Sequence, residues 1–338
     1  MTITEQPNSV PSESDTHRGT FVGGLNEALH YAMREDSRVL VMGEDVATLG
    51  GLFRVTAGLL EAFPGRVIDT PICEGGFVGV GIGAAMAGHA VIVEMQVIDF
   101  LLFAADQLAN AGNLHFVSGA QLSVPIVVRG PCGLGTGFGV THSQRLEAIF
   151  AGRPGLKVLM PSTPADAKGL LTSAIADPSP VVIFEGATLY YAQGDLPPDG
   201  TTVPIGAATV VLEGDACTVA TAGRGVGVCL EAAETLRESH GIAIEIIDLR
   251  SLKPVDWKTI DDSVTRTRRF IATLDGPGFC SYSSYLTAQI AQRWWTTLIS
   301  APRTVGGLDV AGSPSLPAEG RVCINPSLIV EEVKAMIA

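Results

Sequence analysis

The stretch DTPICEGGFVGVGIGAAMAG, residues 69–88, places one carboxylate, Glu74, in front of a long run of small and apolar residues. The apolar run RVIDTP that leads into it predicts a buried strand, and the run that follows predicts a helix packed closely on a sheet. Glu74 would then lie at a strand-to-helix turn, outside the carboxyl end of a strand, where open α/β sheets bind their ligands. The simpler interpretation is an acid favoured by the helix dipole, by ~0.3–1 kcal/mol.

The glycines of this stretch could instead belong to a dinucleotide-binding turn. The nearest match to G-x-G-x-x-G begins at Gly81 and Gly83, but it lacks the third glycine and a well-placed acid about 20 residues later. We therefore expect the glycines, Gly79, Gly83 and Gly88 among them, to serve close packing of the helix.

Composition limits the class of protein. The chain has 338 residues, 46% of them hydrophobic, and a net charge of −13, which argues against nucleic acid as a partner because phosphate binding needs a basic face. The most apolar segment is interrupted by Glu94, Asp99 and Asp106, so no membrane span is predicted. The six cysteines form no CxxC pair, and the N-terminus lacks the pattern of a secretory signal, so we expect a cytoplasmic protein with reduced thiols.

Strand and helix patterns alternate along most of the chain. This alternation predicts an α/β fold made of two doubly wound domains. Residues 1–18, rich in Ser, Pro, Thr and acids, are expected to be a disordered tail. The Pro- and Gly-rich stretch near residue 200 predicts a linker over 196–206, which separates a first domain (19–195) from a smaller second domain (207–338).

Several other polar or aromatic residues follow predicted strands. Glu44 closes the first strand, Gln96 and Phe100 follow another, and the glycine-rich loop RGPCGLGTGFGVTHSQ (129–144) leads to His142. Each has a purely structural interpretation: a buried amide for Gln96, a core ring for Phe100, a structural imidazole for His142. Their shared position at strand ends nevertheless predicts a single site with Glu74.

The motifs, taken in their order along the chain, resemble those of a known family. The segments RVLVMGEDVATLGGLFRVTAGL, DTPICEGGFVGVGIGAAMAG, EMQVIDF, THSQ, PGLKVLMPSTPADAKGLL and IEIIDLRSLKPVD, among others, resemble the β subunit of the E1 component of thiamine-diphosphate-dependent 2-oxo acid dehydrogenases. The resemblance extends over residues ~20–270. It implies a pyrimidine-binding transketolase-like domain followed by a C-terminal transketolase-like domain. The details GGLFR, CEGG and EMQ favour branched-chain over pyruvate members.

The resemblance implies roles for the predicted site. Glu74 would be the catalytic carboxylate that hydrogen-bonds N1′ of the cofactor pyrimidine, and His142 would face the thiazolium. The residues implied to bind the cofactor are Glu44, Ile72, Glu74, Gln96 and Phe100, with Phe100 stacked on the pyrimidine ring. The family's diphosphate and Mg²⁺ are held by the α chain, so the resemblance also implies an α2β2 heterotetramer that is active only when complete.

Two further implications concern a cation and the acyl acceptor. The segment SAIADPSP matches a structural monovalent-cation loop, with K⁺ as the expected ion and carbonyl oxygens as its main ligands; the matching residues are Ile126, Ala174, Ile175, Asp177 and Ser179. The family passes its acyl group to a lipoyl domain of the acyltransferase E2.

The C-terminal third departs from the family pattern, with LDGPGFCSYSSYLTAQIA and LDVAGSPSLPAEGR in place of the usual segments. This departure leaves two alternatives. One is a biosynthetic E1-like subunit that takes a two-carbon or acyl unit from another keto donor, such as a ketose phosphate, to a carrier-protein thiol. The other is a non-catalytic scaffold subunit, against which the presence of Glu74, Gln96 and His142 argues.

Overall fold

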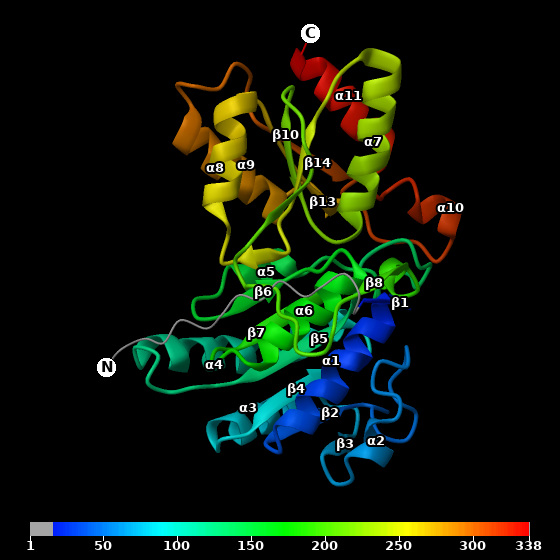
Figure 1. Ribbon diagram of the computed structural model, residues 1–338, viewed down its shortest axis with the longest axis vertical. Helices are drawn as coiled ribbons and strands as arrows, with labels where there is room; N and C mark the ends of the chain where they lie inside the picture. Colours follow the sequence, from blue (N-terminus) through cyan, green and yellow to red (C-terminus); the bar gives the residue numbers. More distant parts are fainter. Residues whose placement is uncertain (1–15, 338) are drawn as a thin grey trace.

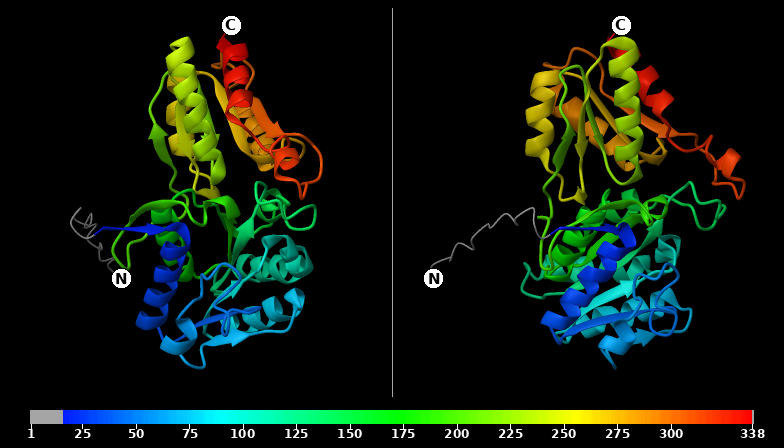
Figure 2. Two further views of the ribbon diagram at one scale, coloured as in Figure 1. Left: turned by 90° about the vertical axis from the view of Figure 1, so that its right-hand side faces the viewer. Right: turned by 45° about the vertical axis from the view of Figure 1, so that its right-hand side comes forward.

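The computed structural model describes residues 16–337, in which two sheets, each with helices on both faces, are stacked along the long axis (Figure 1). The predicted tail over residues 1–15 lies outside the described residues. Figure 2 shows the same two layered units from two further sides, with the C-terminal helix at the end farthest from the first sheet. The expected α/β class with two doubly wound domains is confirmed.

The first sheet has seven strands in the order β12-β6-β7-β5-β4-β2-β3. Six of them are parallel to one another: β2 (Val39–Gly43), β3 (Val67–Asp69), β4 (Ala90–Glu94), β5 (Ile126–Cys132), β6 (Lys157–Leu159) and β7 (Val181–Gly186). Because they are parallel, their carboxyl ends meet at one edge of the sheet, where ligands bind in folds of this kind.

Helices cover both faces of this sheet. The core on one face contains side chains of α1 (Phe21–Glu35) and α6 (Pro164–Ile175). The core on the other contains side chains of α3 (Glu74–Met86), the 3₁₀ helix η2 (Ile98–Ala104) and α4 (Ala105–Val117). The remaining short helices are α2 (Leu59–Ala62), α5 (Glu147–Ala151) and η3 (Ala187–Leu189).

Glycines let α3 approach its neighbours, as expected, but not at every position named; Gly79 makes only an ordinary contact, 3.8 Å from Gln107. A Cβ on Gly81 would lie 3.2 Å from Val93 of β4, and one on Gly75 would lie 2.8 Å from the Phe103 carbonyl of η2. The packing role expected for Gly83 and Gly88 is wrong within this chain, because a Cβ there would meet no atom within 4 Å. Gly88 instead ends the helix with φ +104°, a conformation that favours glycine.

The second sheet has five strands in the order β14-β13-β10-β11-β9. They are β9 (Thr209–Leu212), β10 (Thr218–Thr221), β11 (Glu245–Asp248), β13 (Phe270–Pro277) and β14 (Arg303–Gly307), and only β9 is antiparallel to its neighbour. Helices α7 (Arg224–His240) and α11 (Pro326–Ile337) pack on one face, and α8 (Trp257–Thr267) and α9 (Tyr282–Trp294) on the other (Figure 1). A one-turn helix, α10 (Leu316–Glu319), protrudes beside them.

The predicted domain boundaries need two corrections. Strand β1 (His17–Thr20) pairs antiparallel with β8 (Gln193–Leu196). The tail predicted to residue 18 is therefore too long, because His17 and Arg18 already lie in a strand. The linker predicted over 196–206 likewise begins one residue too early, since Leu196 pairs with His17.

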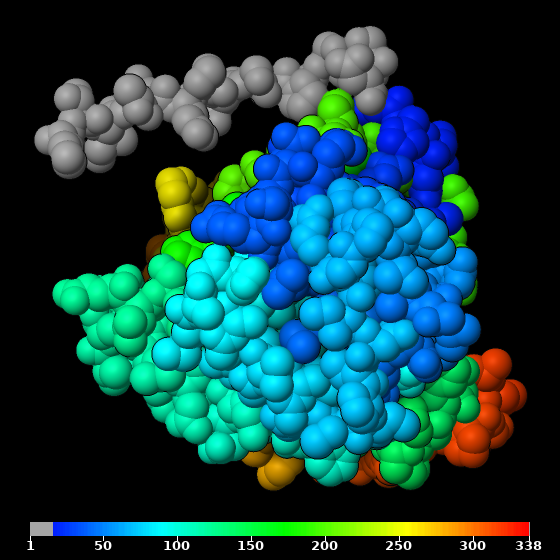
Figure 3. Space-filling view, turned by 90° about the horizontal axis from the view of Figure 1, so that it is seen from below, coloured from blue at the N-terminus to red at the C-terminus, as the bar shows by residue number. Residues whose placement is uncertain are grey.

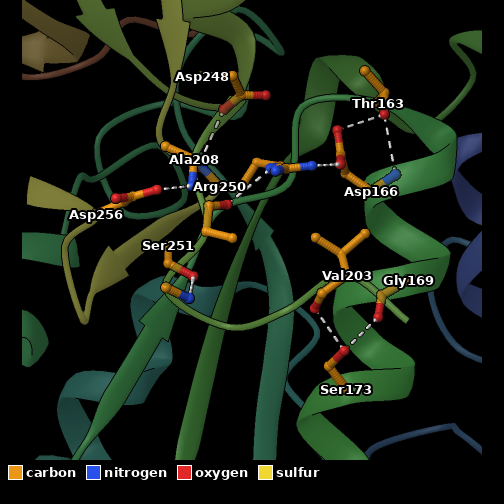
Figure 4. Close-up of polar contacts among 12 residues, drawn as sticks. Thr163, Asp166, Gly169, Ser173, Val203, Ala208, Asp248, Arg250, Ser251 and Asp256 are labelled. Carbon is orange, nitrogen blue, oxygen red and sulfur yellow. Dashed lines mark hydrogen bonds and ion pairs between the residues drawn. The ribbon is translucent and has the colours of Figure 1, made fainter. Parts of the chain in front are cut away.

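The two domains share structure at their junction. The segment IDLRSLKP breaks at Arg250 (φ +54°), and its second part forms β12 (Ser251–Lys253), which pairs antiparallel with β6 of the first sheet. Arg250 then donates to the Ala207 carbonyl at 3.1 Å and to Asp166 Oδ1 at 3.3 Å (Figure 4). Backbone pairing with β6 and an ion pair with α6 thus connect the second domain to the first.

Candidate active site

The predicted site residues converge at the carboxyl edge of the first sheet. Glu44 directly follows β2, Gln96 lies two residues after β4, and His142 lies at the end of the loop that leaves β5. Glu74 is the first residue of α3, whose approach is fixed by the Thr70 N–H donating to the Gly43 carbonyl of β2 at 2.9 Å. The order of the parallel strands therefore brings four distant segments to one edge.

Glu74 and Glu44 form the acidic part of the site. Glu74 is half-buried, whereas Glu44 is 7% exposed. Burial raises the pKa of Glu44, and the negative charges of Glu74 and Asp45 raise it further. Its Oε1 is buried and makes no hydrogen bond to any atom of residues 16–337. A buried acceptor without a partner, beside a second carboxylate, suits a ligand that donates hydrogen bonds.

Gln96 has a partner of its own. Its side-chain amide donates to Asp45 Oδ2 at 3.0 Å, and Asp45 occupies the left-handed region with φ +57°. This contact orients the Gln96 amide toward the end of β2 and beside Glu44. It connects the loops that follow β2 and β4, which are neighbouring strands.

Phe100 and His142 form the aromatic side of the site. Their ring centroids lie 5.2 Å apart with nearly perpendicular planes, and the Thr141 hydroxyl lies 2.7 Å from His142 Nδ1. Phe100 is also stacked on Phe103, with centroids 6.3 Å apart, and both Phe100 and His142 are half-buried, so part of each ring remains exposed. An aromatic ring and an imidazole at the same sheet edge as two carboxylates can hold a flat heteroaromatic group and move protons at it.

Asp99 belongs to this site although sequence reasoning assigned it no role there. The side chain is 3% exposed, and Oδ1 accepts the Gln144 backbone N–H at 2.8 Å. Burial raises the pKa of Asp99, and this hydrogen bond opposes the rise. The only signal in the sequence is that an acid stands next to Phe100 in an otherwise apolar run. Gln144, whose N–H Asp99 accepts, lies 45 positions away in the chain.

Ile72 is the one predicted cofactor residue that the fold does not enclose. Its side chain is 82% exposed and lies in the turn before α3. A hollow of about 370 Å³ is lined by the residues on both sides of Ile72 in the chain, Pro71 and Cys73, and by Thr70, Phe77 and others. Figure 3 shows the first domain from below, with its N-terminal half in blue and cyan.

The residues predicted to hold a cation gather at the opposite edge of the sheet, around the end of α6. The Asp177 N–H donates to the Ala174 carbonyl at 3.2 Å, and Asp177 Oδ1 accepts the Ser179 N–H at 2.9 Å. Lys157 forms an ion pair with the Asp177 carboxylate. The nearby Pro178 carbonyl accepts the Val124 N–H at 2.9 Å, which brings the loop close to Ile126 at the start of β5. The Asp177 charge is thus already balanced, and an ion here would depend on carbonyl oxygens.

Between residues 16 and 337, no three His, Cys, Asp or Glu side chains are grouped so that they could hold a metal ion. Over the same range, no helix has both the length and the apolar character needed to cross a lipid bilayer.

Known proteins share both domains of this chain. The transketolase pyrimidine-binding domain family matches residues 20–193, and the transketolase C-terminal domain family matches residues 206–326. The fold is also that of a split-gene transketolase solved as an inactive β4 tetramer, with a TM-score of 0.77, 21% identity, and coverage of 94% of this chain and 99% of that one.

Curated relatives are more similar in sequence. The 2-oxoisovalerate dehydrogenase subunit β of Bacillus subtilis is 41% identical, over 92% of this chain and 96% of that protein. The pyruvate dehydrogenase E1 component subunit β of Rhizobium meliloti is 40% identical over 97% of this chain and 73% of that protein. The chloroplastic pyruvate dehydrogenase E1 component subunit β-4 of rice (Oryza sativa subsp. japonica) is 39% identical over 98% of this chain and 83% of that protein. The chain therefore belongs to the transketolase-like family, and within it to the β subunits of the E1 components of thiamine-diphosphate-dependent 2-oxo acid dehydrogenases.

Proposed function

We propose that this chain, together with an α-type subunit in an α2β2 heterotetramer, decarboxylates a 2-oxo acid and transfers the acyl group to a lipoyl thiol of an E2 component. The observation that carries the proposal is that two pairs, Glu44 with Glu74 and Phe100 with His142, lie at the same carboxyl edge of the sheet. The similar proteins named as E1 β subunits support the same reaction and favour it over a carrier-protein acceptor or a non-catalytic scaffold.

The residues present fit the pyrimidine half of thiamine diphosphate. The Glu44 Oε1 is a buried acceptor that finds no donor in the described chain, and the Phe100 ring is only half-buried. When bound, thiamine diphosphate supplies the electron sink that decarboxylation of a 2-oxo acid requires. Glu74 would hold the pyrimidine at N1′ and exchange a proton there. Glu44, Gln96 and Ile72 would line the pyrimidine pocket, and His142 would donate or accept a proton at the substrate.

The surface around Glu74 supports a second subunit that completes the pocket. Large apolar side chains are exposed beside the site on the turn before α3, on α3 itself and on η2; they are Ile72, Val80, Met86, Leu102 and Phe103. An exposed apolar surface of this kind is typical of a protein–protein interface. We assign it to the α-type subunit, which would also supply the diphosphate and Mg²⁺ ligands.

The remaining assignments concern substrate, cation and location. The similar β subunits act in both 2-oxoisovalerate and pyruvate dehydrogenases at nearly the same identity, so both keto acids belong in the assay. K⁺ is proposed for the carbonyl loop formed by Ile126, Ala174, Ile175, Asp177 and Ser179. A cytoplasmic location stays a prediction.

The test is a Glu74→Gln variant assembled with the α-type subunit and assayed on pyruvate and branched-chain 2-oxo acids. The amide keeps the size of the side chain but cannot take up a proton, so decarboxylation should fall by about 100-fold or more. Glu61→Gln, at an exposed position of α2, is the matched control and should behave as wild type. Unchanged turnover in Glu74→Gln would contradict the proposed role.

A further inference from the structure

The loop that carries His142 has little structure of its own. We call residues 133–141 the glycine loop. Four of its glycines have positive φ: Gly133 (+93°), Gly135 (+96°), Gly137 (+71°) and Gly139 (+82°). Glycine-rich backbone loses much conformational entropy when it is ordered. The position of His142 therefore depends on contacts that hold this loop from outside.

One such contact comes from the second domain. Glu319, the last residue of α10, is fully buried, and its Oε2 accepts the Gly137 backbone N–H at 2.8 Å. Glu319 is itself held by the surrounding turn, because its N–H donates to the Ser315 carbonyl at 2.8 Å and its carbonyl accepts the Val322 N–H at 2.9 Å. A buried carboxylate that accepts a backbone N–H is one of the stronger hydrogen bonds in proteins.

The surrounding side chains close over the same contact. A Cβ on Gly137 would lie 3.2 Å from Leu316 and 3.3 Å from the Pro314 carbonyl. Leu134 of the glycine loop packs in a small buried cluster with Val322 and Cys323. The loop and the segment around α10 lie side by side in Figure 2, and their green and orange surfaces touch at the edge of Figure 3. Glu319 is thus the polar centre of an apolar contact between the domains.

We propose that Glu319 is a positioning residue: it fixes the glycine loop through Gly137 and thereby sets the position of the His142 ring at the active site. The inference rests on the proposed function, because the catalytic role of His142 is assigned there. On its other side His142 is held within the first domain, where Asp99 accepts the Gln144 N–H. The two carboxylates bracket His142, and Glu319 makes its placement depend on the second domain.

The experiment uses hydrogen exchange followed by mass spectrometry on the assembled heterotetramer, together with steady-state kinetics. In Glu319→Ala the Gly137 N–H loses its acceptor, so exchange in peptides covering 133–144 should rise roughly 10- to 100-fold. Peptides of α7 should exchange as in wild type. The kcat should fall about tenfold while the affinity for thiamine diphosphate stays unchanged, because Glu319 lies outside the pyrimidine site. Glu331→Ala, at an exposed position of α11, is the matched control.

Two conservative variants keep the test decisive if Glu319→Ala does not fold. Glu319→Gln keeps the length of the side chain and one acceptor oxygen, and should stay close to wild type; Glu319→Asp is shorter and should loosen the loop. Wild-type exchange of peptides 133–144 in folded Glu319→Ala, or in Glu319→Asp, would overturn the proposal. The exchange measurement requires no turnover, so it stands even if the enzyme proves inactive on every 2-oxo acid.

Discussion

Asp99 shows how a single buried carboxylate can serve the site by holding backbone. Its Oδ1 holds the backbone two residues beyond His142, and the adjacent Phe100 ring packs against the His142 ring. We expect Asp99→Ala to lower kcat about tenfold, since the Gln144 N–H would lose a buried acceptor whose hydrogen bond is worth roughly 1.5–3 kcal/mol. Asp99→Asn keeps an acceptor oxygen and should lose less.

The measurement is kcat and KM with the α-type subunit, and Asp106→Asn, another acid nearby in the chain, serves as control. Equal loss in Asp99→Asn and Asp99→Ala would show that the charge matters and not the hydrogen bond.

Some residues of the candidate site could be predicted from the sequence and others could not. Glu74 and Glu44 were predictable because a residue after a buried strand lies at a known edge of the sheet. Asp99 and Glu319 were not, because they act on backbone groups 45 and 182 positions away. No local sequence pattern predicts a contact between residues so far apart in the chain. The exposure of Ile72 agrees with the proposed α-type subunit, which would supply the other wall of its pocket.

At the scale of elements, a buried ion network joins three central strands of the first sheet. Arg129 of β5 forms ion pairs with Glu94 of β4 and Glu185 of β7, and all three side chains are buried. Its Nε donates to Glu185 Oε1 at 2.6 Å, and Tyr190 donates its hydroxyl to Glu185 Oε2, also at 2.6 Å. Two carboxylates thus depend on one guanidinium for compensation.

Removing that guanidinium should destabilise the first domain strongly. In Arg129→Met the two carboxylates would stay buried without their cation, so the free energy of unfolding should drop by about 3–5 kcal/mol. Urea denaturation followed by circular dichroism measures the loss. Arg237→Met, at an exposed position of α7, should change stability by less than about 0.5 kcal/mol. A change of the same small size in Arg129→Met would mean that the ion network makes no net contribution to the free energy of unfolding.

Elements were predictable where their pattern is local. The apolar runs of β2, β4, β5 and β7 and the periodic pattern of α1 indicate their own structure. Strands β1, β8 and β12 do not, because they are three or four residues long and exist only through pairing with distant partners. In β12 the neighbouring Arg250 turns the chain from one sheet to the other, which a continuous apolar run cannot reveal.

At the scale of the whole molecule, the junction between the domains contains a buried acid. Asp248, at the end of β11, is 1% exposed, and its Oδ1 accepts the Arg250 N–H at 3.1 Å (Figure 4). Burial raises the pKa of Asp248 to about 7, and the Asp166 carboxylate across the junction adds to the rise. The ordinary pKa of this group is 3.8. At a pH between 3.8 and about 7, the folded protein therefore keeps a proton on Asp248 that the unfolded chain releases.

The free energy of unfolding should therefore decrease as pH rises. The contribution of protonated Asp248 is complete below about pH 4, is lost progressively up to about pH 7, and changes little above that. Between pH 5.5 and 8 the expected loss is on the order of 2 kcal/mol. Asp248→Asn cannot ionise, so its free energy of unfolding should lose that part of the pH dependence, with the gain over wild type largest at pH 8. Asp215→Asn, an exposed acid of the same domain, should keep the wild-type profile. A parallel pH profile for Asp248→Asn and wild type would mean that the junction carboxyl is ionised across the whole range, with Arg250 compensating its charge in place of a bound proton.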